Sequence, residues 1–259
     1  MKQAIGKVYL VGAGPGAPDL LTLRAARLLG RADMVFYDAL VHPETLGLAA
    51  SAVKVAVGKR SGRHSTAQRF INKQLIDAAQ KFQTVVRLKG GDPMLFGRAQ
   101  EEIDALNAAG VPVEIVPGVS AAFAASADLH LSLTRRALAR SVVFATPREA
   151  QGSRSNTWAK VAAVADTVVL YMAAGAAQAV SDALIANGVP ASRPAVIIEN
   201  ASTDERKVIP TDVGHLPAAA QRVGGGPALV MVGDIYADVQ AAIAGEAMYP
   251  APLPVCRSA

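Results

Sequence analysis

The sequence VVRLKGGDPMLFGRAQEE, residues 85–102, predicts a strand, a turn and a helix in direct succession. Its first residues are β-branched or aliphatic and lack helical spacing, which favours a strand. Gly90-Gly91-Asp92-Pro93 ends that strand, because glycine permits left-handed backbone angles and a residue before proline is held extended. A helix is predicted from about Gly97 to Ala109, with Gly110 as its stop. A carboxylate and two glycines therefore lie at the carboxyl end of a strand, where open α/β sheets bind ligands.

The same alternation of strands and helices extends in both directions along the chain. Strands are expected over residues 7–11, 34–38, 53–57, 85–89 and 113–116, and again over 141–146, 167–172, 195–199, 206–209 and 228–233. Helices are expected over residues 20–30, 66–81, 97–109, 120–127, 158–165, 177–187, 211–222 and 235–244. Alternation of this kind indicates the α/β class.

An irregular segment with three arginines, residues 129–140, interrupts this alternation. We therefore expect two α/β domains, residues 1–128 with a parallel sheet and residues 141–247 with a mixed sheet, joined by 129–140 as a linker. Residues 248–259 are rich in proline and are expected to form a flexible tail. A cleft between the two domains is the expected active site.

The composition excludes several classes of protein. The chain has 259 residues, of which 51% are hydrophobic and 18% charged, so a large core is available. The only cysteine is Cys256, which rules out a disulfide framework and fits a reducing cytoplasm. No signal peptide opens the chain, and the most apolar run contains Asp166 and Gly175, so no membrane segment is expected. The net charge of +5 is mild and lacks the aromatic-rich basic patch of a nucleic-acid site.

Two further patterns bear on catalysis. The four histidines are scattered without ligand spacing, so no metal site is expected. Gly12-x-Gly14-x-x-Ala17 after a strand, followed by Asp38 at the end of the next strand, fits an NAD-dependent dehydrogenase. Pro15 and Pro18 oppose that alternative, because the dinucleotide motif opens its helix within the glycine turn.

A series of motifs adds a resemblance to a known family. In chain order they are VYLVGAGPGAPDLLTLRAARLL, VFYDALV, GKR, VVRLKGGDPMLFGRAQEE, VPGVSAA, TRRALARS, LYMAAG and IENAS. Together, from about Val8 to Asp234, they resemble the tetrapyrrole methylase family. The resemblance implies S-adenosylmethionine-dependent C-methylation of uroporphyrinogen III at C2 and C7 to give precorrin-2, in sirohaem or cobalamin biosynthesis. It also implies S-adenosylhomocysteine as the second product, and a homodimer.

The resemblance further implies roles for individual residues. Asp38 matches the proton acceptor of the family and Lys59 its proton donor, while Arg98 is an alternative base. The choice between Asp38 and Arg98 stays open at this point. Glu101 and Arg136, with Arg98, match tetrapyrrole contacts. The cofactor-binding positions are Pro15, Gly90, Gly91, Asp92, Leu95, Ser120, Ala121, Met172 and Ala201.

Three departures from the family pattern lie on the substrate side. The chain has GRAQEE where the family has GRGGEE, HLSLTRR where it has GIPLTHR, and Ala145-Thr146-Pro147 where it has TGH. They leave room for a related methylase that acts on a different precorrin. We also expect this chain alone to stop at precorrin-2, since the roughly 100 residues of a further oxidising domain are not found in it.

Overall fold

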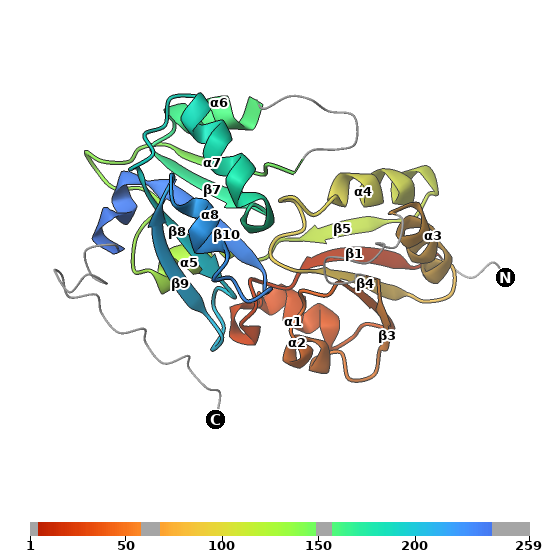
Figure 1. Ribbon diagram of the computed structural model, residues 1–259. Coiled ribbons are helices and arrows are strands. Elements are labelled where there is room, and N and C mark those ends of the chain that lie inside the picture. The colour runs from red at the N-terminus through yellow and green to blue at the C-terminus, as the bar shows by residue number, and fades with distance from the viewer. Residues whose placement is uncertain (1–4, 58–67, 149–156, 240–259) are drawn as a thin grey trace. The chain divides into compact units, whose positions relative to one another are not determined.

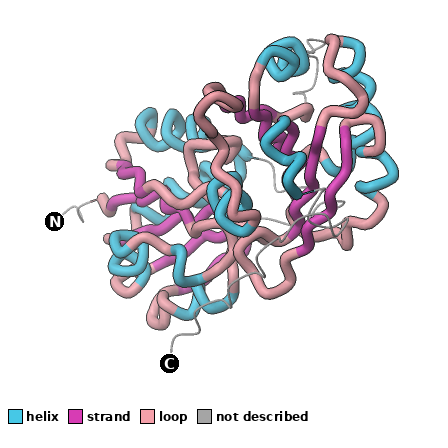
Figure 2. Tube along the Cα trace, turned by 90° about the vertical axis from the view of Figure 1, so that its left-hand side faces the viewer, coloured by secondary structure: helices cyan, strands magenta, loops and turns pink. Residues whose placement is uncertain are grey.

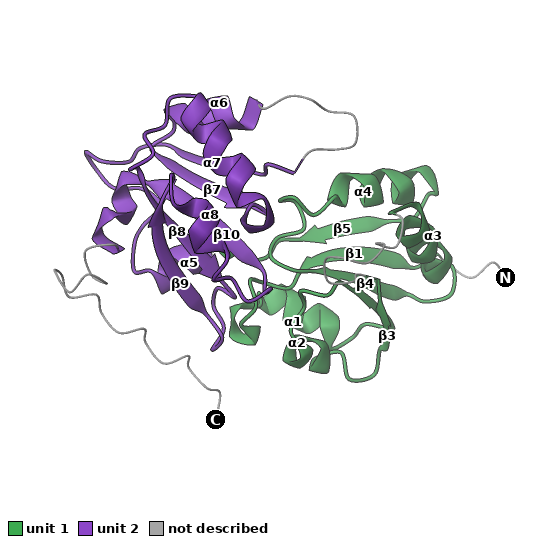
Figure 3. Ribbon diagram, viewed as in Figure 1, with its two compact units in different colours: residues 1–121 green, residues 122–259 purple. Residues whose placement is uncertain are grey.

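Two compact units, residues 1–121 and 122–259, make up the chain (Figures 1 and 3). The structure is a computed structural model that describes residues 5–57, 68–148 and 157–239. Each unit has its own five-stranded sheet, and Figure 2 shows the strands of each unit in magenta with helices around them. The α/β class, with one parallel and one mixed sheet, is thereby confirmed.

The first unit is a parallel sheet with the strand order β3-β2-β4-β1-β5. Its strands are β1 (Lys7–Gly12), β2 (Met34–Tyr37), β3 (Val53–Ala56), β4 (Thr84–Lys89) and β5 (Val113–Val116). Its helices are the 3-10 helix η1 (Pro18–Leu20), α1 (Leu23–Leu29), α2 (Pro43–Gly47), α3 (Gln68–Ala79) and α4 (Ala99–Ala108). Both faces of the sheet are covered, as a parallel sheet requires.

Alternate residues of β4 are buried against different helices. Val85 packs in one core with Leu75 of α3 and Leu106 of α4. Val86 and Leu88 pack in a separate core with residues of α1. The helices α1 and α4, which follow the neighbouring strands β1 and β4, therefore cover opposite faces of the sheet (Figure 1).

The second unit is a mixed sheet with the order β6-β7-β10-β8-β9, in which only β6 and β7 are parallel neighbours. Its strands are β6 (Val142–Ala145), β7 (Thr167–Tyr171), β8 (Pro194–Glu199), β9 (Lys207–Asp212) and β10 (Ala228–Gly233). The helices are α5 (Ala121–Asp128), α6 (Thr157–Val164), η2 (Ala174–Ala176), α7 (Ala177–Ala186), α8 (Leu216–Ala220) and η3 (Asp234–Tyr236). Its core is built mainly of aliphatic side chains such as Ile197 and Val230.

The division between the units falls at residue 121, before the boundary placed at residue 128 from the sequence. The reason is the packing of α5 with the second sheet. The Ala122 N–H donates to the Tyr171 hydroxyl at 3.3 Å, and the Phe123 ring meets the Phe144 ring edge-on with 5.9 Å between centroids. The segment 129–140 also belongs to the second unit, because Arg140 N–H donates to the Asp166 carboxylate at 2.8 Å.

Among the differences from the expected helix boundaries, three late starts have a local cause. The helix predicted from residue 20 begins at Leu23, where the Thr22 hydroxyl accepts the Ala25 N–H. The helix predicted over 211–222 is limited to Leu216–Ala220, because Thr211 and Asp212 extend β9. The helix predicted from Gly97 begins at Ala99, since the backbone of Arg98 has a left-handed conformation. Across the described residues, every helix is too short or too polar to span a membrane.

Candidate active site

The loops that follow β1 and β4 are joined to each other by their main chains. Gly91 N–H donates to Gly14 C=O at 2.6 Å, and Gly14 N–H donates to Gly91 C=O at 3.3 Å. Ala13 N–H donates to Lys89 C=O at 2.7 Å. Because α1 and α4 then leave on opposite faces, this is a topological switch point, the usual ligand site of an open α/β sheet.

Three glycines allow these loops to pack backbone on backbone. A Cβ placed on Gly12 would lie 2.6 Å from Gly118 Cα and 2.7 Å from Gly91 O, so a side chain is excluded there. Gly91 differs, because its φ is +67° and a Cβ would meet nothing within 4 Å. The Gly91 main chain thus has one open side, which a ligand can approach closely.

The Asp92 carboxylate ties this turn to the loop after β5. One oxygen accepts the Met94 N–H at 2.8 Å and the other accepts the Gly118 N–H at 2.9 Å. The contact with Gly118 joins the β4 and β5 loops. Asp92 therefore builds the turn, and its direct contact with a cofactor stays a prediction.

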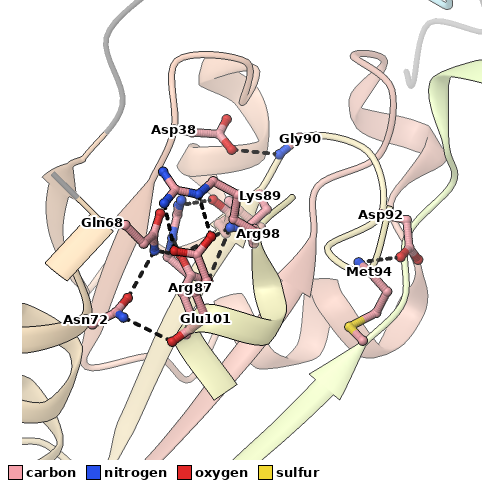
Figure 4. A network of polar contacts seen from close by, with 12 residues as sticks. Asp38, Gln68, Asn72, Arg87, Lys89, Gly90, Asp92, Met94, Arg98 and Glu101 are labelled. Atoms are coloured by element: carbon pink, nitrogen blue, oxygen red, sulfur yellow. Dashed lines mark hydrogen bonds and ion pairs between the residues drawn. The ribbon is translucent and has the colours of Figure 1, made fainter. Parts of the chain in front are cut away.

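Asp38 follows β2 and reaches the same turn (Figure 4). Its carboxylate accepts the Gly90 N–H at 3.1 Å and the Leu40 N–H at 3.0 Å. Residues 52 positions apart in the sequence are thereby joined. The expected proton acceptor is thus at the turn that carries Gly90, whereas Lys59, the expected proton donor, lies outside the described residues.

Arg98 and Glu101 form a bidentate pair at the start of α4 (Figure 4). The Arg98 Nε and Nη2 donate to the two Glu101 carboxylate oxygens, each at 2.7 Å. This pairing lowers the pKa of Glu101 and raises the pKa of Arg98. Both side chains are about half exposed, 56% and 51%, so they can meet a ligand. A guanidinium held protonated in this way is suited to binding carboxylates rather than to accepting a proton.

A buried charged cluster lies directly beside this turn, and sequence reasoning did not find it. Arg87 and Lys89 alternate with apolar residues on β4, a spacing that places both on the α3–α4 face. Their partner is the buried carboxylate of Glu102 in the first turn of α4. Two cations two residues apart in an otherwise apolar strand were the available signal.

The remaining expected cofactor positions of the first unit lie on the same edge of its sheet. Pro15 follows Gly14 in the β1 loop, and Leu95 lies in the turn between β4 and α4. Ser120 and Ala121 follow β5, with Ser120 buried. The first unit thus brings together the loops after β1, β2, β4 and β5.

Met172 and Ala201 lie in loops at the same end of the second sheet. Met172 directly follows β7, and Ala201 lies just beyond the end of β8. Tyr171 pairs with Leu229 and Glu199 with Ala228, so both loops lie where β10 begins. Met172 has a φ of +57° and an exposed side chain, which is an unusual backbone for a non-glycine residue.

The Ala201 loop is held in a strained form by a partly buried ion pair. Asn200 and Ser202, on either side of Ala201, have φ values of +53° and +68°. The Asp128 carboxylate accepts the Ser202 N–H at 2.7 Å and pairs with Arg206 at 2.7 Å. Backbone strain of this kind persists only where the surroundings fix it, and it is concentrated at functional sites.

Arg136 is not brought to Met172 and Ala201 within this unit. It is exposed in the turn between Arg135 and Ala139, whose main chains are bridged. The chain then reaches Arg140, which is bound at the start of β7, whereas Met172 follows the end of that strand. The role of Arg136 as a tetrapyrrole contact stays a prediction. Within the described ranges, no group of three or more His, Cys, Asp or Glu side chains is placed to hold a metal ion.

Comparison with known proteins assigns the fold to a family. Residues 7–217 match the family model for tetrapyrrole (corrin/porphyrin) methylases. The chain belongs to the tetrapyrrole methylase family. The first loop of this tetrapyrrole methylase also disagrees with the dinucleotide alternative. After Ala17 the chain forms η1, and α1 begins only at Leu23, so no helix N-terminus opens within the glycine motif.

Relatives of this methylase are found among larger proteins and among single-module structures. A sirohaem synthase from Stutzerimonas stutzeri is 43% identical over 235 residues, covering 90% of this chain and 50% of the relative. One from Pseudomonas fluorescens is 44% identical over 232 residues, covering 89% and 50%. The chain thus spans about half the length of the curated relatives it matches.

Solved structures match the chain over almost their whole length. The native uroporphyrin III C-methyl transferase of Thermus thermophilus has a TM-score of 0.79 and 38% identity, covering 89% of this chain and 98% of that one. The Thermus thermophilus protein complexed with S-adenyl homocysteine has a TM-score of 0.78. A cobalt precorrin-4 methyltransferase has a TM-score of 0.78 and 28% identity, covering 89% and 95%.

Proposed function

We propose that this chain transfers methyl groups from S-adenosylmethionine to C2 and C7 of uroporphyrinogen III, giving precorrin-2 for sirohaem or cobalamin synthesis. The observation that carries the proposal is the match to the Thermus thermophilus enzyme, whose complex contains S-adenyl homocysteine. The match covers nearly all of that protein, so it includes the residues of both units. The GGDPMLFGR turn and its partner GAGPG loop supply the site to which the proposal refers.

The geometry of the glycine turn fits the cofactor. The open side of Gly91 allows close approach to the main chain, which suits the ribose and methionine portion of a nucleoside ligand. Pro15, Leu95 and Ser120 lie on the adjoining loops, and Met172 and Ala201 are the corresponding positions of the second unit. S-adenosylmethionine supplies a methyl group already activated by a sulfonium, so the protein has to orient the substrate and accept a proton.

Asp38 is the residue to which we assign proton acceptance. Two backbone N–H groups, those of Gly90 and Leu40, fix its carboxylate beside the glycine turn. As the new carbon–carbon bond forms and the carbon–sulfur bond breaks, the pyrrole system becomes cationic. A carboxylate in this position stabilises that charge and then takes the proton that the ring system loses.

Arg98 serves a different purpose in this proposal. Its guanidinium is held protonated by Glu101, so it is a poor proton acceptor and a good partner for carboxylates. Uroporphyrinogen III carries acetate and propionate groups around its ring. Arg98 and Glu101 therefore orient the tetrapyrrole, with Arg136 as a further contact.

We also propose a homodimer in the cytoplasm with no bound metal and no nucleic-acid partner. The family resemblance supports the homodimer, and the single cysteine supports a reducing compartment. Light scattering at micromolar concentration tests the homodimer, which a monomeric mass would contradict.

A binding titration tests the cofactor assignment. Calorimetry with S-adenosylhomocysteine and NAD side by side should give micromolar binding of the first and none of the second. Binding of NAD without any response to S-adenosylhomocysteine would contradict the proposal.

Two observations favour a second candidate substrate, a later precorrin. The departures GRAQEE and Ala145-Thr146-Pro147 lie on the substrate side, and the match to a cobalt precorrin-4 methyltransferase is nearly as good in TM-score. Offering uroporphyrinogen III and a later precorrin separately decides between the two substrates. Methylation of the later precorrin alone would favour the second.

A further inference from the structure

The buried cluster beside the turn has more positive than negative charge. The Glu102 carboxylate is fully buried and accepts from Lys89 Nζ at 3.2 Å on both oxygens and from Arg87 Nε at 3.2 Å. Gln68 Nε2 donates to the same carboxylate at 3.0 Å. One carboxylate therefore meets two cations, neither of which is more than about one-twentieth exposed.

Arg87 alone would neutralise Glu102. It remains at hydrogen-bonding distance from the carboxylate, and its Nη1 also donates to Leu88 C=O at 3.0 Å. The Lys89 ammonium is consequently an additional positive charge in a buried environment. Burial lowers the pKa of Lys89, and the charge of Arg87 lowers it further. A fold that needed only to satisfy Glu102 would not require this lysine.

Lys89 lies directly beneath the active-site turn. It is the last residue of β4, and Gly90, which donates to Asp38, follows it. A Cβ placed on Gly97 would lie 3.1 Å from Lys89 Cε, so the turn packs closely over the Lys89 side chain. The charge of Lys89 also interacts favourably with the carboxylates of Asp38 and Glu101 (Figure 4).

We propose that Lys89 is a positioning residue for the tetrapyrrole: its surplus buried charge holds Asp38 and the Arg98–Glu101 turn in place and draws the substrate carboxylates toward that turn. The inference rests on the proposed function, because it names the residue that prepares the same site for its anionic substrate. In a medium of low dielectric constant the field of a buried charge reaches further than that of an exposed one. Burying this additional charge lowers the stability of the fold, and such a loss of stability is common at active sites.

The variant Lys89→Met separates this role from a structural one. Methionine keeps most of the aliphatic volume under Gly97 and removes the charge, leaving Arg87 and Glu102 as a neutral pair. A unit charge acting over about 10 Å at an effective dielectric constant of about 20 changes binding by about tenfold. We expect the KM for uroporphyrinogen III to rise by about that factor, the KM for S-adenosylmethionine to stay within about twofold, and the Tm not to fall.

Lys73→Met is the matched control. Lys73 is exposed on α3 and pairs with Asp77 at 3.0 Å, so its loss removes the same charge from the surface. Both KM values should be unchanged in this control. Lys89→Gln, which retains one donor to Glu102, replaces Lys89→Met if the latter fails to fold, and the same change in KM is expected of it.

The outcomes are distinguishable from failure of the proposed function. Wild-type protein that does not methylate uroporphyrinogen III overturns the proposed function and this inference with it. Active wild type with an unchanged tetrapyrrole KM in Lys89→Met overturns the inference alone. An equal rise in both KM values together with a lower Tm also overturns it, because that pattern indicates a purely structural lysine.

Discussion

The main chains of Gly14 and Gly91 pair in both directions across the switch point of the first sheet. This pairing joins two glycine-rich segments that are far apart in the sequence. It also explains Gly12 in the first segment, since a Cβ there would lie 2.7 Å from Gly91 O. The open side of Gly91 is therefore a product of long-range packing as well as of local turn chemistry.

Gly91→Ala should abolish or strongly weaken S-adenosylhomocysteine binding, because the added methyl group enters the open side of the turn. The left-handed φ of +67° also imposes a strain of about 1 kcal/mol on alanine. Gly110→Ala is a matched control, with a φ of +69°, no atom within 4 Å of its Cβ, and a position at the far end of α4. It should show the same loss of stability and normal binding in calorimetry. Equal binding in the two variants would contradict the assignment of this turn to the cofactor.

Asp38→Asn should lower kcat by about 10²–10⁴, the usual contribution of a general base, and leave S-adenosylhomocysteine binding nearly unchanged. Asparagine keeps an oxygen that can accept the Gly90 N–H, so the turn should persist.

Arg98→Lys should instead raise the KM for the tetrapyrrole, because the bidentate pair with Glu101 is lost. Single-turnover rates measure both effects. A larger loss of rate in Arg98→Lys than in Asp38→Asn would make Arg98 the better base.

Asp92→Ala should weaken cofactor binding and lower the stability of the protein. It leaves the part-buried Gly118 N–H without its acceptor, a loss of up to about 1–3 kcal/mol, and it removes the exposed bond to the Met94 N–H. Asp104→Ala, on the exposed face of α4, is the control and should change neither property. Chemical denaturation and calorimetry measure the two effects, and normal binding by Asp92→Ala would limit Asp92 to a structural role.

Arg136→Ala should raise the tetrapyrrole KM and spare the cofactor. This prediction rests on the family resemblance, since Arg136 lies away from Met172 and Ala201 within its own unit. Steady-state kinetics with each substrate varied in turn provides the test. An unchanged tetrapyrrole KM would remove Arg136 from the site.

The Asp166 carboxylate should make stability depend on pH in the acid range. Its pKa is lowered from the usual 3.8 by the N–H of Arg140 and by the Ser141 hydroxyl and N–H. A carboxyl with a depressed folded-state pKa stabilises the fold fully above its unfolded pKa, and the contribution is lost as the pH falls through the folded pKa. The difference in Tm between wild type and Asp166→Asn should therefore be largest near neutral pH and shrink below about pH 4. Asp182→Asn on α7 is the control, and the same pH dependence in both variants would contradict the role of Asp166.

Local sequence patterns predicted the elements that depend on local chemistry. The strand before Gly90, the turn at Gly90–Pro93 and the carboxylate at the end of β2 follow from residue type and order alone. The predicted start of α4 was two residues too early, because Arg98 has a left-handed φ of +54°. No residue preference marks that conformation in advance.

Long-range contacts account for the features that the sequence did not reveal. The bond from Gly118 to Asp92 and the pairing of Glu102 with Lys89 join different elements, so residue spacing does not reveal the partners. The two cations of β4 indicate only that a buried carboxylate is needed. The division of the units at residue 121 depends on a similar contact, since α5 is apolar and small-residue-rich and packs with Tyr171 of the following sheet. The Ala201 loop likewise depends on Asp128, which precedes it by more than seventy residues.

C-methylation of uroporphyrinogen III by this chain is tested most directly by mass spectrometry of the tetrapyrrole. The protein is incubated anaerobically with uroporphyrinogen III and with S-adenosylmethionine that carries an isotopically labelled methyl group. We expect a tetrapyrrole with two labelled methyl groups, at C2 and C7, and a matching amount of S-adenosylhomocysteine. Asp38→Asn, run in parallel, should give little product from the same mixture. Recovery of only unlabelled uroporphyrinogen III from folded protein that binds S-adenosylhomocysteine would contradict the assigned methylation.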